Sequence, residues 1–175
     1  MWSTTNGTLS SKPLSPKLET IIVTAVAITV CGSIAVVGYN SGHLTAFNIQ
    51  SGINRGLFGR MYAHRGKITG VSTDNINKFV ISTGGKDVRI WDLSERSLCS
   101  SLALSHTITR SLLHRESSLF ACALSNRTVS VIDIDTSKLV REFPHPAEIL
   151  DMCYSLDGRH LIVATSDKSR ETWQN

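Results

Sequence analysis

The sequence is poor in aromatic and charged side chains. Phe, Trp and Tyr make up 6% of the 175 residues and Asp, Glu, Lys and Arg 18%, whereas the hydrophobic fraction is 41%. A hydrophobic fraction of this size excludes a chain that is disordered throughout. Because the apolar residues are mainly Val, Ile, Leu and Ala, which suit strands packed in layers, the composition favours β structure. The length corresponds to one domain or to part of a larger one.

Motifs for metal, redox, nucleotide and secretory chemistry are missing. Cys31, Cys99, Cys122 and Cys153 lie too far apart for a C-x-x-C motif, and most of them lie in apolar runs, which predicts buried, reduced thiols in a cytosolic or nuclear protein. No P-loop and no G-x-S-x-G nucleophile elbow occurs. The N-terminus lacks the basic and apolar regions of a secretory signal. We therefore expect no cofactor, no metal site and no small-molecule substrate.

One long stretch has no charged residue, from Thr20 to Asn54. Its apolar part, Ile21–Val37, is about as long as a bilayer is thick, so a membrane anchor is one alternative. However, Cys31–Ser33 in its middle signals a turn, and the flanks are dense in Val, Ile and Thr, which favour strands. Two buried strands joined by a tight turn are the preferred interpretation, and we expect no membrane partner.

The chain repeats itself from residue 18 onward. The clearest copy is Phe79–Asp92, which ends in Trp91-Asp92, the dipeptide typical of WD40 repeats. Aligned copies place the corresponding marker residues at Phe47, Ile132 and Trp173, so that successive markers are 44, 41 and 41 residues apart. This spacing matches the period of about 40–45 residues that a propeller blade requires.

Short apolar segments flank each marker hairpin and complete four strands per repeat. They are Val23–Thr29, Arg55–Gly59, Ile68–Ser72, Leu98–Leu104, Ile108–Leu113, Leu139–Phe143 and Ile149–Ser155. The predicted fold is all-β: a partial WD40 β-propeller of about four blades, each of four antiparallel strands, over residues 18–175. A flexible leader rich in Ser, Thr and Asn is expected at residues 1–17.

A set of polar and Trp residues recurs in the repeats. In the WD40 blades that these repeats resemble, His, Ser or Thr, Asp and Trp form a buried hydrogen-bond chain, which here comprises His64, Ser82, Asp87, Trp91, His145, Asp167 and Trp173. Ala164 stands where the second copy has Ser82, so the network is complete in at most one blade. A hydrolase using His64, Ser82 and Asp87 is the alternative. A structural role is preferred, because satisfied buried polar networks commonly specify a fold without chemistry.

Basic residues gather in several loops of this mildly basic chain, whose formal net charge is +4. The groups are Arg65 with Lys67, Arg110 with His114 and Arg115, Lys138 with Arg141, and Arg159 with Lys168 and Arg170. Ordinary solvated charge is the preferred interpretation over contact with RNA phosphates, since surface Lys and Arg are common and no RNP-type aromatic motif is present.

Several stretches are similar to one family of WD40 proteins. The segments Phe47–Gly52, His114–Leu124, Val129–Asp135 and Asp157–Arg159, together with Thr172-Trp173, resemble a WD-repeat subunit of the small-subunit processome, in the U three small nucleolar RNA-associated protein twenty-one family. The resemblance covers roughly Val23 to Trp173. Members of this family resemble two tandem propellers followed by a helical tail, so four blades favour a segment of the second propeller, or a truncated product.

The resemblance implies a nucleolar scaffold in the UTP-B subcomplex, which helps to process pre-rRNA and to build the small ribosomal subunit. Its partners would be other processome proteins, with contact to pre-rRNA or a small nucleolar RNP, and its work would be binding rather than catalysis. The main alternative is a WD40 adaptor in ubiquitin transfer or signalling, because a fold alone does not determine function.

Overall fold

The strands follow the predicted repeats closely. The structure is a computed structural model that describes residues 22–167 and 170–174, and within these residues every regular element is a β-strand. The strands are β1 (Val23–Ile28), β2 (Ile34–Tyr39), β3 (Leu44–Asn48), β4 (Asn54–Leu57), β5 (Ile68–Thr73), β6 (Phe79–Gly84), β7 (Asp87–Asp92), β8 (Leu98–Ala103), β9 (Ile108–Leu113), β10 (Leu119–Leu124), β11 (Thr128–Asp133), β12 (Lys138–Pro144), β13 (Ile149–Tyr154), β14 (His160–Thr165) and β15 (Arg170–Gln174). The leader predicted at residues 1–17 lies outside the described residues.

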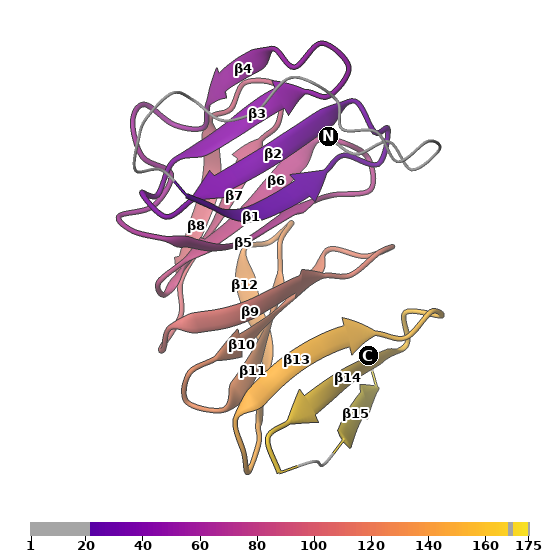
Figure 1. The fold of residues 1–175 in the computed structure, drawn as a ribbon. Helices are drawn as coiled ribbons and strands as arrows, with labels where there is room; N and C mark the ends of the chain where they lie inside the picture. Colours follow the sequence, from indigo (N-terminus) through magenta and orange to yellow (C-terminus); the bar gives the residue numbers. More distant parts are fainter. Residues whose placement is uncertain (1–21, 168–169, 175) are drawn as a thin grey trace, which may run out of the picture.

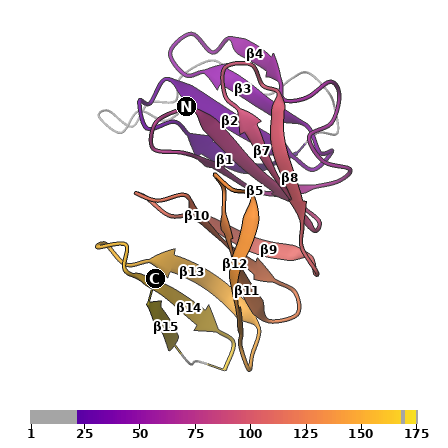
Figure 2. The same ribbon diagram turned by 180° about the vertical axis from the view of Figure 1, so that it is seen from behind.

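The strands form four antiparallel sheets in chain order, β1–β4, β5–β8, β9–β12 and β13–β15, here called sheets 1 to 4. The inner strands β1, β5, β9 and β13 follow one another down Figure 1, and each packs beside the next. Seen from behind, the outer strands β8 and β12 come to the front (Figure 2). The prediction of an all-β array of propeller blades is confirmed.

Sheet 4 differs from the predicted four strands per blade. It contains three strands within the described residues, in the order β13-β14-β15. The last of them, β15, ends at Gln174. Strand β15 nevertheless pairs along β14 from Gln174 to Arg170.

Hydrophobic clusters fill the spaces between neighbouring sheets. Side chains alternate across each strand, so adjacent residues such as Val80 and Ile81 pack against different neighbouring sheets. Val36 and Leu44 meet Val80 and Trp91 between sheets 1 and 2; Ile81 and Val88 meet Phe120 and Ile132 between sheets 2 and 3; Ala121 and Val131 meet Leu161 and Val163 between sheets 3 and 4. Each fully buried large side chain contributes roughly 1.5–3 kcal/mol to stability.

The uncharged stretch forms a hairpin, as predicted. β1 pairs antiparallel with β2 across a turn in which Gly32 has a φ of +69°. This positive φ suits a residue without a Cβ. In the described part of the chain, no helix is long and apolar enough to cross a membrane.

The cysteines correct one expectation from the sequence. All four thiols are free, but only Cys122 is buried, and its pKa is raised by that burial. The prediction of buried thiols is wrong for Cys31 in the β1–β2 turn, for Cys99 on the outer strand β8 and for Cys153 on β13, all of which are exposed. Apolar residues next to a cysteine in the sequence do not bury it when it lies at a turn or on an uncovered face.

Candidate functional site

The second repeat brings three buried side chains into one hydrogen-bond chain. Trp91 Nε1 donates to Ser82 Oγ at 2.8 Å, and His64 Nε2 lies 2.7 Å from the same oxygen. None of the three is more than 2% exposed. Ser82 lies on β6 and Trp91 on β7, whereas His64 precedes β5 in the connection that comes from sheet 1. This hydrogen-bond chain therefore attaches the connection to the middle of sheet 2.

The electrostatics keep His64 neutral. Burial, and after it the charge of Arg89, lower the pKa of His64 to about 4, against an opposing contribution from Asp87. Asp87 does not hydrogen-bond to His64: its carboxylate lies 3.5 Å from Arg89 Nη2, and His64 Nδ1 has no hydrogen-bond partner among the described residues. The structure thus joins His64, Ser82 and Trp91 directly and leaves Asp87 beside them.

The residues predicted for the fourth repeat lie around sheet 4. His145 is buried before β13, and Asp167 accepts a hydrogen bond from Thr165 Oγ1 at 2.7 Å. Trp173 lies on β15 with its backbone paired to Leu161, and its side chain lies outside the described residues.

The strand register corrects the alignment at Ser82. Ser82 pairs with Arg89, two residues before Trp91. In sheet 4 the residue that pairs two positions before Trp173 is Val163, not the predicted Ala164. The physical reason is the β14–β15 connection, residues 166–169, which is longer than the two-residue connection between β6 and β7.

Sheets 1 and 3 also lack a hydroxyl at this position. By the same register, Val37 occupies it in sheet 1 and Cys122 in sheet 3. The marker Trp91 is likewise replaced there by Phe47 and Ile132. Among the four described sheets, Ser82 is therefore the one hydroxyl at this register position.

The arrangement of His64 and Ser82 resembles a catalytic dyad in distance alone. Ser82 is fully buried and already accepts the indole N–H of Trp91, so no substrate carbonyl can approach its Oγ. A nucleophile needs access to a bound substrate. Across residues 22–167 and 170–174, no group of three His, Cys, Asp or Glu side chains could hold a metal ion.

The connection that His64 anchors runs from residue 58 to residue 67 and is here called loop 58–67. Ala63 N and His64 N both donate to Gly42 O, at 2.9 and 3.0 Å, and Phe58 N donates to Leu44 O at 2.9 Å. The Phe58 and Ala63 side chains are fully buried, and the Phe58 ring meets the Trp91 indole edge-on with centroids 6.1 Å apart. Both ends of the loop are thus fixed.

Two glycines make room for this anchor. Gly42 has a φ of +85°, and a Cβ there would collide with the carbonyl oxygen of His64. A Cβ on Gly84 would lie 2.7 Å from His64 Cγ, closer than real Cβ contacts. The backbone approaches closely at both positions, which only glycine permits.

Polar side chains also organise the turns that follow the inner strands. The first residue of each turn accepts a backbone N–H from the same turn: Thr29 from Ile34, Asp74 from Lys78, His114 from Glu116 and Ser155 from His160. These contacts satisfy backbone donors that no strand pairs. The repeat pattern does not predict these contacts, although the sequence places a polar residue directly after each inner strand.

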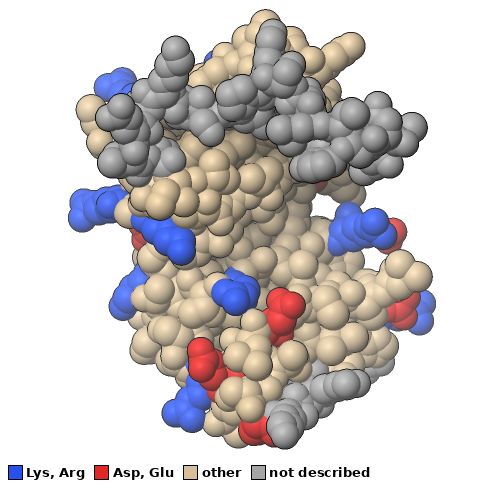
Figure 3. All heavy atoms as spheres, viewed as in Figure 1, with Lys and Arg blue, Asp and Glu red and all other residues tan. Residues whose placement is uncertain are grey.

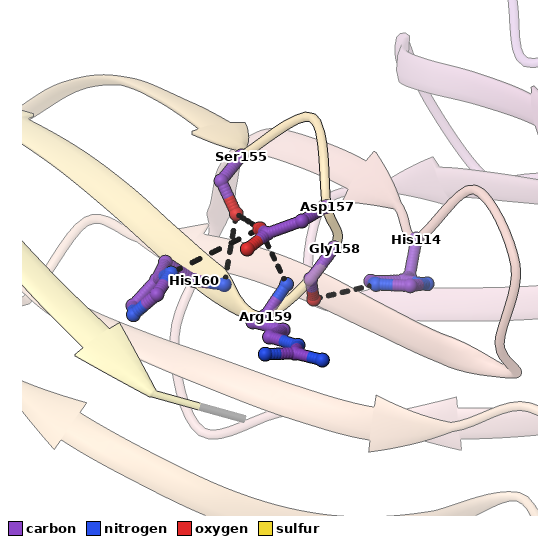
Figure 4. Close-up of polar contacts among 6 residues, drawn as sticks. All are labelled: His114, Ser155, Asp157, Gly158, Arg159 and His160. Atoms are coloured by element: carbon purple, nitrogen blue, oxygen red, sulfur yellow. Dashed lines mark hydrogen bonds and ion pairs between the residues drawn. The ribbon is translucent and has the colours of Figure 1, made fainter.

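His114 joins two of these turns. Its Nε2 donates to Gly158 O at 2.8 Å (Figure 4), and its Nδ1 accepts from Glu116 N. In the neighbouring turn, Asp157 accepts from Ser155 Oγ and Arg159 N, which lowers the pKa of its carboxyl. The sequence placed His114 in a solvated basic group; instead it is 9% exposed and links sheets 3 and 4.

Comparisons with known proteins identify similar chains. Residues 1–175 match the family described as the WDR36/Utp21 second beta-propeller domain. The chain is 43% identical over 171 residues to WD repeat-containing protein 36 of Homo sapiens, covering 97% of this chain and 19% of that protein. It is 34% identical over 153 residues to U3 small nucleolar RNA-associated protein 21 of Saccharomyces cerevisiae, covering 86% of this chain and 16% of that protein.

A homolog of that yeast protein in Schizosaccharomyces pombe is 29% identical over 174 residues, covering 98% of this chain and 19% of the homolog. The chain thus spans about a fifth of the length of these relatives. Among solved structures, the computationally designed Ika4 protein superposes with a TM-score of 0.77 at 19% identity, covering 94% of this chain and 99% of that one. This likeness supports the fold alone.

Proposed function

Because this chain belongs to the family of the second β-propeller of WDR36 and Utp21, we propose that it is a non-catalytic scaffold of the small-subunit processome. In that role it supports pre-rRNA processing and the biogenesis of the small ribosomal subunit in the nucleolus. The observation that carries the proposal is the family match over residues 1–175, with 43% identity to the human relative. The names of the two yeast relatives associate those proteins with U3 small nucleolar RNA.

The geometry supports binding rather than catalysis. His64 and Ser82, the side chains with catalytic potential, are buried and hold loop 58–67 in place. The turns are stiffened by side-chain contacts within and between sheets, such as the bond from His114 to Gly158. A rigid array with fixed turns presents its surface to partners at a low cost in conformational entropy. The proposed partners are other processome proteins, the UTP-B subunits among them.

Fractionation of cell extracts tests this proposal. A tagged copy of the full chain would be expressed in cells and followed through a sucrose gradient, with U3 RNA and processome proteins measured in each fraction. We expect the chain to sediment with pre-ribosomal particles and to co-purify U3 RNA. Trp91→Ala, which breaks the packing between sheets 1 and 2, should abolish the association with pre-ribosomal particles. Arg141→Ala, which removes an exposed side chain, should preserve it. Recovery only in light fractions, bound to ubiquitin-transfer or signalling proteins, would support the adaptor alternative instead.

A further inference from the structure

The net positive charge of the chain lies in one segment that has no acidic residue. From Thr20 to Thr73 the sequence contains no Asp and no Glu, but it contains Arg55, Arg60, Arg65 and Lys67. The chain has 18 Lys and Arg in total, and the other 14 are balanced by 14 acidic residues. This segment therefore accounts for the whole formal net charge of +4.

Three of these four cations lie on loop 58–67. Arg60, Arg65 and Lys67 are exposed, and none of them forms an ion pair among the described residues. The corresponding connections into sheets 3 and 4, residues 104–107 and 145–148, contain neither Lys nor Arg. On the face seen in Figure 3, several of the Lys and Arg side chains lie beside Asp or Glu. Loop 58–67 is thus the one connection between sheets that is both long and basic.

An exposed aromatic ring lies between these cations. Tyr62 is 51% exposed and its neighbour Met61 is 63% exposed. The ring of His43 supports Tyr62 from one side, with centroids 4.5 Å apart and planes inclined by 45°, and Ser41 Oγ holds His43 Nδ1 at 2.7 Å. Here the protein supports one part of the ring and presents the rest to solvent.

We propose that loop 58–67 binds single-stranded RNA. Arg60, Arg65 and Lys67 would contact successive phosphates, and Tyr62 would stack on an unpaired base, which is the combination that sequence-tolerant single-strand binding uses. An acidic protein segment would be attracted by the same charges but would gain little from a flat exposed ring, so the ring favours nucleic acid. The choice of RNA over single-stranded DNA rests on the proposed function.

The buried polar chain gives this site its rigidity. Phe58 and His64 fix the two ends of the turn that carries Arg60, Met61 and Tyr62, and Gly42 O holds the backbone of Ala63 and His64. A loop that is already ordered pays little conformational entropy on binding. The hydrogen bonds among His64, Ser82 and Trp91 thus also order the loop that carries the proposed RNA site.

Fluorescence anisotropy with a short labelled oligouridine and the purified full chain tests the proposal. We expect wild-type affinity to fall as salt rises, and the triple change Arg60→Ala, Arg65→Ala and Lys67→Ala to reduce the slope of log affinity against log salt by about 2, since each single-strand phosphate contact contributes about 0.7. Tyr62→Ala should weaken binding roughly 5- to 100-fold, and Tyr62→Phe should retain it, because stacking needs the ring alone.

A matched control removes the same charge elsewhere. Lys138→Ala, Arg141→Ala and Arg159→Ala together change three exposed cations and should leave affinity and salt slope close to wild type. Equal losses of affinity in the control variant, or no binding by the wild type, would overturn the proposal. Normal binding by Tyr62→Ala together with displacement of the RNA by polyglutamate would also overturn it, in favour of an acidic protein segment. Photocrosslinking of thiouridine-labelled RNA to the wild type should map to the peptide containing Tyr62, and a crosslink confined to other sheets would contradict it. The assay contains no processome protein, so its failure would leave the scaffold proposal standing.

Discussion

Sheets 2 and 3 have the same four-strand order and nearly the same strand lengths, yet they are fastened differently. Sheet 2 carries Ser82 and Trp91 and receives the buried His64 from a connection of ten residues. Sheet 3 has Cys122 and Ile132 at the corresponding positions, and its preceding connection is only residues 104–107, where His106 is exposed. The buried polar chain occurs where a long loop needs an anchor, and apolar packing suffices where the connection is short.

The largest expected effect comes from removing the marker side chain of sheet 2. Trp91→Ala deletes a ring that packs between sheets 1 and 2 and that donates to Ser82, so we expect a loss of about 3–5 kcal/mol in the free energy of unfolding. Urea denaturation measures it. The smaller change Ile132→Val in sheet 3 should cost about 0.5–1.5 kcal/mol. Equal losses for the two variants would remove the distinction between the sheets.

Acid should weaken sheet 2 through His64. Burial holds the pKa of folded His64 at about 4, below the 6.5 of an unperturbed histidine. The unfolded chain then binds the extra proton first, so the contribution is complete above about pH 6.5 and is lost as the pH falls toward 4, by roughly 3 kcal/mol. Urea denaturation across this range should show the loss in the wild type. His64→Gln should flatten this dependence, whereas the exposed His106→Gln in front of sheet 3 should leave it in place.

Removing the central hydroxyl gives a closer test of the same comparison. Ser82→Ala leaves the buried Trp91 Nε1 without its acceptor and His64 Nε2 without its partner, so we expect a loss of about 1–3 kcal/mol. Cys122→Ala, at the same register position in sheet 3, removes only a buried sulfur and should cost about 1 kcal/mol. Thermal or urea unfolding of the two variants measures both losses of stability. A greater loss for Cys122→Ala would argue against a stabilising role for the buried polar chain.

A smaller effect is expected at the turns between sheets 3 and 4. His114→Ala removes the bond to Gly158 O and the acceptor for Glu116 N, with an expected cost of about 1 kcal/mol, the net contribution of a typical hydrogen bond. Hydrogen exchange at Glu116 should accelerate, while exchange at Lys78 in the corresponding turn of sheet 2 should not. Faster exchange in both turns would indicate a general loosening instead of a local one.

The spacing of the repeats predicts the sheets, because each sheet takes up one repeat and markers such as Trp91 and Trp173 reveal the repeat length. The alignment failed by one residue at Val163, since spacing does not show how many residues a connection such as 166–169 takes up. Burial of the cysteines was also mispredicted, because neighbouring residue types do not reveal which face of a strand is covered. Arg65 and Lys67 mark the basic loop in the sequence, but the exposure of Tyr62 and its support by His43 depend on tertiary contacts that no local pattern encodes.

The most direct test of the fastener is amide hydrogen exchange at Ala63 and His64, whose N–H groups donate to Gly42 O. In the wild type both amides should be protected, and Ser82→Ala should lower that protection about tenfold or more, while Leu104 and Ile108, which are bonded to the β6–β7 turn, keep theirs. Unchanged protection at Ala63 and His64 in Ser82→Ala would contradict the claim that the buried polar chain holds loop 58–67 in place.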